Sequence, residues 1–146
     1  MHTVATLSAH DADLALATIR AELGRRRKAA VIAVADRHGE LLALHRMDGA
    51  GLPSITVAAN KAWTAARLGE TTGQVGRAAQ TQGWSFAYYA DPRYVGWDGG
   101  APGQLAGQVL GAVAVSGLAP EEDLELALLG VQAVQDALTS VTGQAG

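Results

Sequence analysis

The sequence predicts a single α+β domain, and three observations lead to this prediction. A chain of 146 residues has the length of one domain. Apolar residues recur at helical spacing in some segments, and short apolar runs flank turn residues in others, as in β-hairpins. No internal repeat or linker interrupts residues 1–146. The expected order is helix, hairpin, helix, lid, hairpin, helix.

A helix and a hairpin are expected first. Apolar residues at helical spacing predict a helix over about residues 9–23, with Gly24 as its C-terminal residue. The apolar runs 30–35 and 41–44 follow as two strands. Gly39 lies between them and supplies the positive φ that a tight hairpin turn requires.

A second helix and a long irregular segment come next. Pro53 suits a first helical turn, and a helix is expected over about residues 53–68. From 69 to 103 the periodicity disappears and glycines recur, so this segment is predicted to be a loop. Disordered segments are poor in aromatic residues, whereas this segment is rich in them, so it is predicted to be ordered. The loop is either a lid or subunit contact over apolar surface, or the aromatic wall of a ligand pocket. It holds six of the seven aromatic residues: Trp84, Phe86, Tyr88, Tyr89, Tyr94 and Trp97.

A second hairpin and a last helix complete the predicted fold. The hairpin joins residues 104–105 to 108–116, and the later strand is apolar enough to be buried on both faces. The last helix is expected from Pro120 to about Leu138. Acidic residues at 121–123 stabilise the positive end of its dipole.

Composition excludes several classes of function. The net charge of −3 argues against nucleic acid as a partner. The absence of cysteine excludes disulfides, iron–sulfur clusters and thiolate nucleophiles, and the histidines lack metal-ligand spacing, so no metal site is expected. No apolar run approaches the roughly 18 residues of a membrane span. The first 20 residues do not resemble a secretory signal, so a cytoplasmic protein is expected.

Two short constellations near predicted strand ends could carry chemistry. Arg46 and Asp48 follow the second strand, where a cation and a carboxylate could bind a ligand carboxylate or transfer a proton. The alternative is a helix cap by Asp48 and a surface pair by Arg46. At Asp98, Gly99 and Gly100, paired glycines let backbone N–H groups approach an anion, although a plain tight turn is the alternative.

Lys61 and Glu122 are further candidates. Lys61 is one of two lysines and lies in an alanine-rich helix, where burial would let it anchor an anion or lower its pKa for catalysis. An ordinary surface lysine is the alternative. Glu122 lies in the polar run 116–123. The alternative interpretation of this run is the start of a helix. No standard catalytic signature occurs, so these residues indicate a small-ligand pocket and nothing more specific.

Five motifs in order make the chain resemble the GlcG/HbpS-like family of small haem-binding or haem-degrading-type proteins. This family is also found as the C-terminal domain of PduO-type cobalamin adenosyltransferases. The resemblance covers nearly the whole chain. Its motifs lie at 31–39, 46–50, 60–65, 99–102 and 111–117, the last followed by Glu122-Asp123.

The resemblance implies a profilin-like fold, with a central antiparallel sheet of about five strands flanked by helices. It also implies homo-oligomers and, for some members, haem binding. The segment from Trp84 to Asp98 is richer in Trp and Tyr than the usual approach to the motif at 99–102. This departure suggests a remodelled pocket.

Two functions are therefore expected to compete. The first is a small-ligand-binding protein for haem or a related tetrapyrrole, with His45 as axial ligand. The residues expected to contact the ligand are His45, Asn60, Thr64, Tyr88, Tyr89, Trp97, Gly99 and Gly100. The second is a cofactor-free isomerase, cyclase or hydrolase acting on a small oxygenated metabolite. Its expected catalytic residues are Arg46 and Lys61, which hold an enolate or carboxylate, and Asp48, Asp98 or Glu122 as acid or base.

Low charge predicts self-association. Charged residues make up 17% of the chain, against roughly 25% in ordinary globular proteins. Apolar surface is therefore expected to be covered by a second copy. We expect a dimer or a multiple of dimers, in which residues 84–97 help to complete the neighbour's pocket.

Overall fold

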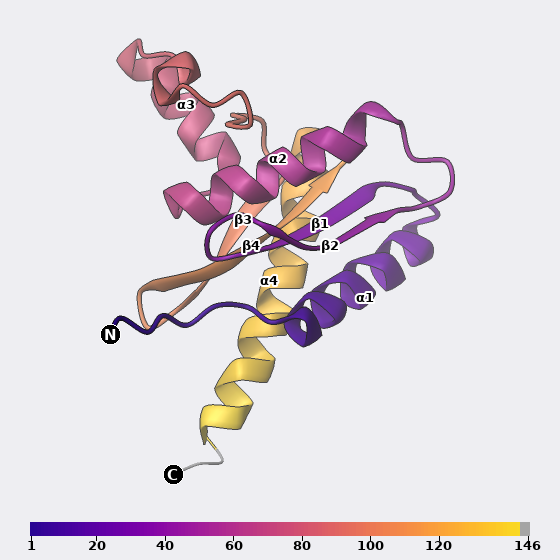
Figure 1. Ribbon diagram of the computed structural model, residues 1–146. Helices are drawn as coiled ribbons and strands as arrows, with labels where there is room; N and C mark the ends of the chain where they lie inside the picture. Colours follow the sequence, from indigo (N-terminus) through magenta and orange to yellow (C-terminus); the bar gives the residue numbers. More distant parts are fainter. Residues whose placement is uncertain (144–146) are drawn as a thin grey trace.

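A four-stranded antiparallel sheet in the order β2-β1-β4-β3 forms the middle layer of the computed structural model, which describes residues 1–143. Helix α2 covers one face of the sheet, and α1 and α4 cover the other (Figure 1). No helix within the described residues is long and apolar enough to cross a membrane. The strands are β1 (Val31–Asp36), β2 (Leu41–Arg46), β3 (Gly100–Leu105) and β4 (Gln108–Ser116). The helices are α1 (Ala9–Arg26), α2 (Pro53–Leu68), α3 (Thr72–Gln82) and α4 (Pro120–Gly143), with a 3-10 turn at Phe86–Tyr89.

The two faces of the sheet carry different cores. Along β1, Ile32 and Val34 face α1 and α4, where larger aliphatic side chains pack. The alternate residues of β1 face α2, and this interface consists mostly of alanines, including Ala58 and Ala62. Small side chains let a helix lie close to a sheet. The alanine-rich helix predicted from the sequence therefore packs against the sheet.

The strand number differs from the expected five. The described residues contain four strands, and β2 and β3 are the edges of the sheet. The chain between α2 and β3 forms α3 and the 3-10 turn instead of pairing with an edge. In Figure 1, α3 projects away from the sheet beyond α2.

The prediction of a loop throughout residues 69–103 was wrong, because α3 lies within this segment. Thr71 and Gln74 form a capping box that begins this helix. Its glycines concealed it in the sequence. A Cβ on Gly73 would lie 1.6 Å from Asp98 Oδ1, and one on Gly76 would lie 2.1 Å from a backbone oxygen. Both glycines thus serve close packing against residues 96–98.

Both predicted hairpins form. Gly39 has a φ of +93°, as its turn requires. In the second hairpin, Ala106 and Gly107 both have positive φ, which matches the twist of the flanking strands. The strand β3 begins at Gly100, earlier than expected, and β4 is buried from Leu110 onward.

The ends of two helices lie beyond the predicted positions. Helix α1 continues past Gly24 and ends where Arg27 adopts the left-handed conformation, with φ of +57°. A side chain at Gly24 would meet nothing within 4 Å, so this glycine has no packing role. Helix α4 continues past Leu138 to Gly143.

Candidate functional site

Lys61 is buried, with 2% of its surface exposed. Its Nζ donates hydrogen bonds to Val115 O at 3.0 Å and to Asp123 Oδ2 at 3.1 Å. Asp123 is also buried, with 3% exposed, and lies in the first turn of α4. The pair therefore joins α2 on one face of the sheet to α4 on the other. The surface-lysine alternative is wrong.

Two glycines make room for this ion pair. A Cβ on Gly99 would lie 2.6 Å from Lys61 Nζ and 2.5 Å from Val115 O, and its φ of +127° disfavours other residues. A Cβ on Gly100 would lie 2.6 Å from Lys61 O. The packing role of these two residues was missed by the sequence analysis, which considered only an anion site or a turn.

Burial shifts the pKa values of both members of the pair toward their neutral forms. Desolvation lowers the pKa of Lys61, and the attraction of Asp123 opposes that shift. Desolvation likewise raises the pKa of Asp123, although Lys61 and a hydrogen bond from Leu118 N at 3.1 Å oppose it. The proton between these two groups is therefore held less firmly on the amine than at a solvated lysine.

A small cavity opens onto this pair, and we name it the lysine cavity. Its volume is about 330 Å³. Asp98 also lines it, and its charge acts on Lys61. Arg77 donates to Asp98 Oδ2 at 3.1 Å, whereas Asp98 Oδ1 is buried and has no hydrogen-bond partner among residues 1–143. The polar side chains of the lining are Ser54, Lys61, Asp98, Ser116 and Asp123.

A larger groove with aromatic walls adjoins this cavity, and we name it the aromatic groove. It has a volume of about 640 Å³, and small residues of α3 form part of its surface. The aromatic rings near it contact one another, with Trp84 and Phe86 centroids 5.2 Å apart. Trp97 lines both the groove and the lysine cavity and is 67% exposed. Its aromatic lining consists of Trp84, Phe86, Tyr94 and Trp97.

Two buried threonines hold the aromatic segment in position. Thr64 Oγ1 donates to Arg93 O at 3.3 Å and accepts from Val95 N at 3.0 Å. Thr72 Oγ1 donates to Trp97 O at 2.5 Å and accepts from Gly100 N at 3.0 Å. Thr64, which we predict to contact a ligand, binds the backbone of the segment that lines the groove.

Arg46 and Asp48 lie outside both the cavity and the groove. Both are exposed at the end of the edge strand β2. Arg46 is in register with Val31, which is in register with Ser116, so two strand spacings of about 4.8 Å separate Arg46 from the cavity wall. Helix α2 has Leu52 at its N-cap, without a side-chain hydrogen bond, so Asp48 is not its cap.

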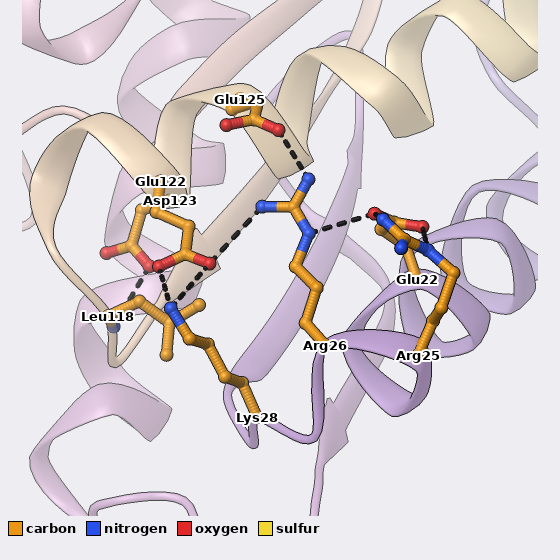
Figure 2. Close-up of polar contacts among 8 residues, drawn as sticks. All are labelled: Glu22, Arg25, Arg26, Lys28, Leu118, Glu122, Asp123 and Glu125. Carbon is orange, nitrogen blue, oxygen red and sulfur yellow. Dashed lines mark hydrogen bonds and ion pairs between the residues drawn. The ribbon is translucent and has the colours of Figure 1, made fainter.

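Glu122 points away from Lys61, although Asp123 beside it forms the buried pair. Figure 2 shows the Glu122 carboxylate with Arg26, the last residue of α1, and with Lys28, which follows that helix. The Lys28 Nζ to Glu122 Oε2 distance is 2.6 Å. Arg26 also pairs with Glu22 and Glu125. Arg26 and Lys28, at the C-terminal end of α1, thus join α1 to α4 through ion pairs with Glu122 and Glu125.

The remaining predicted ligand contacts are spread over the surface. His45 is opposite Ile32 in the sheet, so its side chain is on the face covered by α1, away from the cavity and the groove. Asn60 is half-buried and lines neither space. Tyr88 is 80% exposed and lines neither, and Tyr89 stacks on Tyr94 at 4.3 Å.

A third cavity of about 700 Å³ is lined by two histidines that were not among the predicted site residues. His2 and His38 line it, together with Arg67 and Tyr94. Tyr94 also lines the aromatic groove, so the two spaces are neighbours. Among residues 1–143, no three His, Cys, Asp or Glu side chains are grouped closely enough to hold a metal ion.

The pairing of Asp123 with Lys61 was not predicted, because the sequence indicates only a helix-dipole role for this residue. Ser54, which lines the cavity, and Thr72, which holds its edge, were not predicted either. The sequence did contain a signal for Asp123. The motif at 111–117, which resembles that of the GlcG/HbpS-like family, is followed by an aspartate at the spacing typical of that family, and this aspartate is Asp123. Pairing it with Lys61 required knowledge of how α4 packs.

Comparison with known proteins identifies the family of the chain. The family model described as "Haem degrading protein HbpS-like" matches residues 7–132. An uncharacterised 15.0 kDa protein of the dhaT-dhaS intergenic region of Citrobacter freundii is 37% identical over 99 residues, which cover 66% of this chain and 70% of that protein. The chain therefore belongs to the HbpS-like family.

Solved structures agree with this assignment. The crystal structure of Klebsiella pneumoniae protein ORFY has a TM-score of 0.85 and 31% identity, and the match covers 92% of this chain and 94% of that one. A haem complex of PduOC has a TM-score of 0.79 and 25% identity, covering 88% of this chain and 94% of that one. An HbpS double mutant from Streptomyces reticuli, 23% identical with a TM-score of 0.82, shares the fold and covers 90% of this chain and 89% of that one.

Proposed function

We propose, from membership of the HbpS-like family, that this protein binds a small ligand and that the ligand is haem or a related tetrapyrrole. The observation that carries the proposal is the likeness to a PduOC domain solved with haem, over most of both chains. The aromatic groove supports it. A planar macrocycle can stack on aromatic faces such as those of Trp84 and Phe86.

The groove offers aromatic walls for the macrocycle but no axial histidine for the iron. Its lining contains no histidine. His45, which we predict as the axial ligand, is on the opposite face of the sheet, whereas His38 lines the neighbouring cavity. An axial ligand must therefore reach the groove from outside its lining. Replacing His45 or His38 separately and comparing the haem spectra distinguishes the two histidines as axial ligands.

Hemin titration tests this proposal. We expect a saturable shift of the Soret band, and we expect Trp84→Ala and Phe86→Ala to weaken binding about tenfold, because each removes a stacking face. Leu128→Ala, at an exposed position of α4 on the other side of the sheet, is the matched control. The absence of a saturable shift would remove haem as the ligand. An unaltered spectrum in His45→Ala or His38→Ala would remove that histidine as axial ligand.

A second candidate function is proton-transfer catalysis on a small oxygenated metabolite, without a cofactor. The buried arrangement of Lys61, Asp98 and Asp123 around one cavity favours it, since buried ionisable groups with shifted pKa values are frequent at active sites. Lys61 would donate to a substrate oxygen and a carboxylate would move the proton. Its test is turnover, by the protein without added cofactor, of carbonyl or hydroxy acid intermediates made by enzymes encoded beside its gene. Loss of turnover in Asp98→Asn would support the assignment. Turnover by this variant at the rate of the wild-type protein would contradict it.

We also propose a dimer or a multiple of dimers, in which residues 84–97 contact the second copy. Tyr88, Tyr89 and Trp97 are exposed aromatic side chains of one segment, and exposed apolar patches of this kind mark interaction surfaces. We expect Trp97→Ala and Tyr89→Ala to weaken assembly and hemin binding together. A cytoplasmic location stays a prediction.

A further inference from the structure

Lys61 has an unused donor position and lies in the lining of the lysine cavity. An ammonium group has three N–H donors. Two of them are used within the protein, by Val115 O and by Asp123 Oδ2. Lys61 is also part of the lining of the lysine cavity. The third position of Nζ is therefore the one that a molecule in the cavity can occupy.

The cavity suits a small molecule with a polar end. Its volume of about 330 Å³ is at the lower limit of the 300–1,000 Å³ typical of ligand pockets. Ser54 and Ser116 are among its lining residues, and a serine hydroxyl can donate to or accept from an oxygen atom. Trp97 lines it as well and has a large apolar ring. A compound of a few carbon atoms with one carbonyl group matches this lining.

A proton acceptor for the amine is already in place. Asp123 Oδ2 is 3.1 Å from Lys61 Nζ, and both side chains are almost completely buried. Burial favours the neutral amine over the ammonium, and it favours the carboxylic acid over the carboxylate. The other ionisable group facing Lys61 across the cavity is Asp98, whose charge favours the ammonium and whose own carboxylate is held by Arg77. A proton can thus move along the hydrogen bond between Lys61 and Asp123.

We propose that Lys61 forms a Schiff base with a small aldehyde or ketone that enters the lysine cavity. This inference rests on the second candidate function and names its substrate class and its nucleophile. Lys61 passes one proton to Asp123, and the free amine adds to the carbonyl carbon to form a carbinolamine. Asp123 returns this proton to the carbinolamine hydroxyl, which leaves as water while the C=N bond forms. One ammonium and one carbonyl group become one protonated imine and one water, without an oxidant or reductant.

The chain contains an internal control for this reaction. Lys28 is the only other lysine, and it is 46% exposed and paired with Glu122. An imine on either lysine can be reduced by cyanoborohydride to a stable secondary amine and located by peptide mass mapping. We would treat the full-length protein with propanal, hydroxyacetone or pyruvate and cyanoborohydride, and measure the labelling rates of Lys28, Lys61 and the N-terminus over a range of pH.

The expected result is labelling of Lys61 at least about tenfold faster than Lys28 near pH 6, where an ordinary lysine is almost fully protonated. The advantage should disappear in urea, where both lysines are solvated. Lys61→Arg keeps the charge beside Asp123 and should abolish labelling at this position, while Lys28→Arg should leave the rate at Lys61 unchanged. Labelling of Lys61 no faster than Lys28 with all three probes would overturn the proposal, even if Lys61→Arg fails to fold.

This readout separates the proposals. Trapping detects imine formation without turnover, so turnover without trapping would contradict the Schiff base and leave proton-transfer catalysis in place. Trapping without turnover would support the nucleophile and contradict catalysis on the tested substrates. Hemin binding is measured independently of both.

Discussion

The buried pair of Lys61 and Asp123 yields a quantitative prediction about stability. Replacing Lys61 with methionine keeps the aliphatic volume and removes the charge, which leaves Asp123 buried without its partner. Replacing Asp123 with asparagine keeps an acceptor for Leu118 N and leaves Lys61 without its carboxylate. The double variant Lys61→Met/Asp123→Asn leaves neither charge unpaired.

The magnitude follows from the geometry of the pair. At 3.1 Å and an effective dielectric constant of about 20, the attraction is about 5 kcal/mol. Desolvation of two ions costs several kcal/mol each, so the intact pair contributes about zero to the free energy of unfolding. A lone charge can escape its penalty by becoming neutral. At about 1.4 kcal/mol per pH unit, this limits the loss near pH 7 to about 4 kcal/mol for Asp123 and about 5 kcal/mol for Lys61.

The two single variants should therefore show opposite dependence on pH. In Lys61→Met, the folded state raises the pKa of Asp123, so the loss of stability is small near pH 4 and grows as pH rises toward that raised pKa. In Asp123→Asn, the folded state lowers the pKa of Lys61, so the loss is large at low pH and fades as pH rises toward about 10. Asp98 attracts Lys61 and should reduce the second loss.

Urea unfolding of the four proteins at acidic, neutral and alkaline pH measures these effects. We expect each single variant to lose about 2–4 kcal/mol near pH 7 and the double variant to be within about 2 kcal/mol of the wild type. Additive losses in the double variant would refute the direct coupling of these side chains. Equal pH dependence of the two single variants would refute the argument that each of them leaves one buried charge without its partner.

Three further predictions follow from other parts of the molecule. Gly99→Ala should lower the free energy of unfolding by about 2 kcal/mol or more, because its φ is positive and its Cβ would collide with Lys61 Nζ and Val115 O, whereas Gly51→Ala, where a Cβ meets nothing, is a control in thermal unfolding. Hydrogen bonds from Arg25 and then Arg26 lower the pKa of Glu22 to about 2, so stability present above its unfolded pKa of about 4.3 should fall as pH drops toward 2, and Glu22→Gln should flatten this part of an acid-unfolding curve. Light scattering of the protein at micromolar concentration should return at least twice the mass of one chain, and a value near the 15.0 kDa of one chain would contradict assembly.

Much of the fold could be predicted from the sequence, because those parts depend on interactions between neighbouring residues. Pro53 and the apolar spacing behind it were sufficient to locate α2, and its bounds agree with the predicted 53–68. Gly39 and Gly107 helped to locate the two hairpin turns, since glycine tolerates the positive φ that such turns require. Lys61 stood out as a polar residue in an alanine-rich helix, and Asp98 as the residue before two glycines.

Which of the candidate residues come together depends on the packing of the helices on the sheet. Asp123 meets Lys61 because α4 packs on the opposite face of the sheet from α2, and no local pattern records that contact. The same packing turns Glu122 toward Lys28, and the register of β2 places His45 on the face away from the groove. Helix α3 escaped prediction because Gly73 is required by contact with Asp98, a residue distant in the chain. Local backbone preferences depend on consecutive residues, whereas contacts between the layers of the fold depend on how whole helices and strands pack.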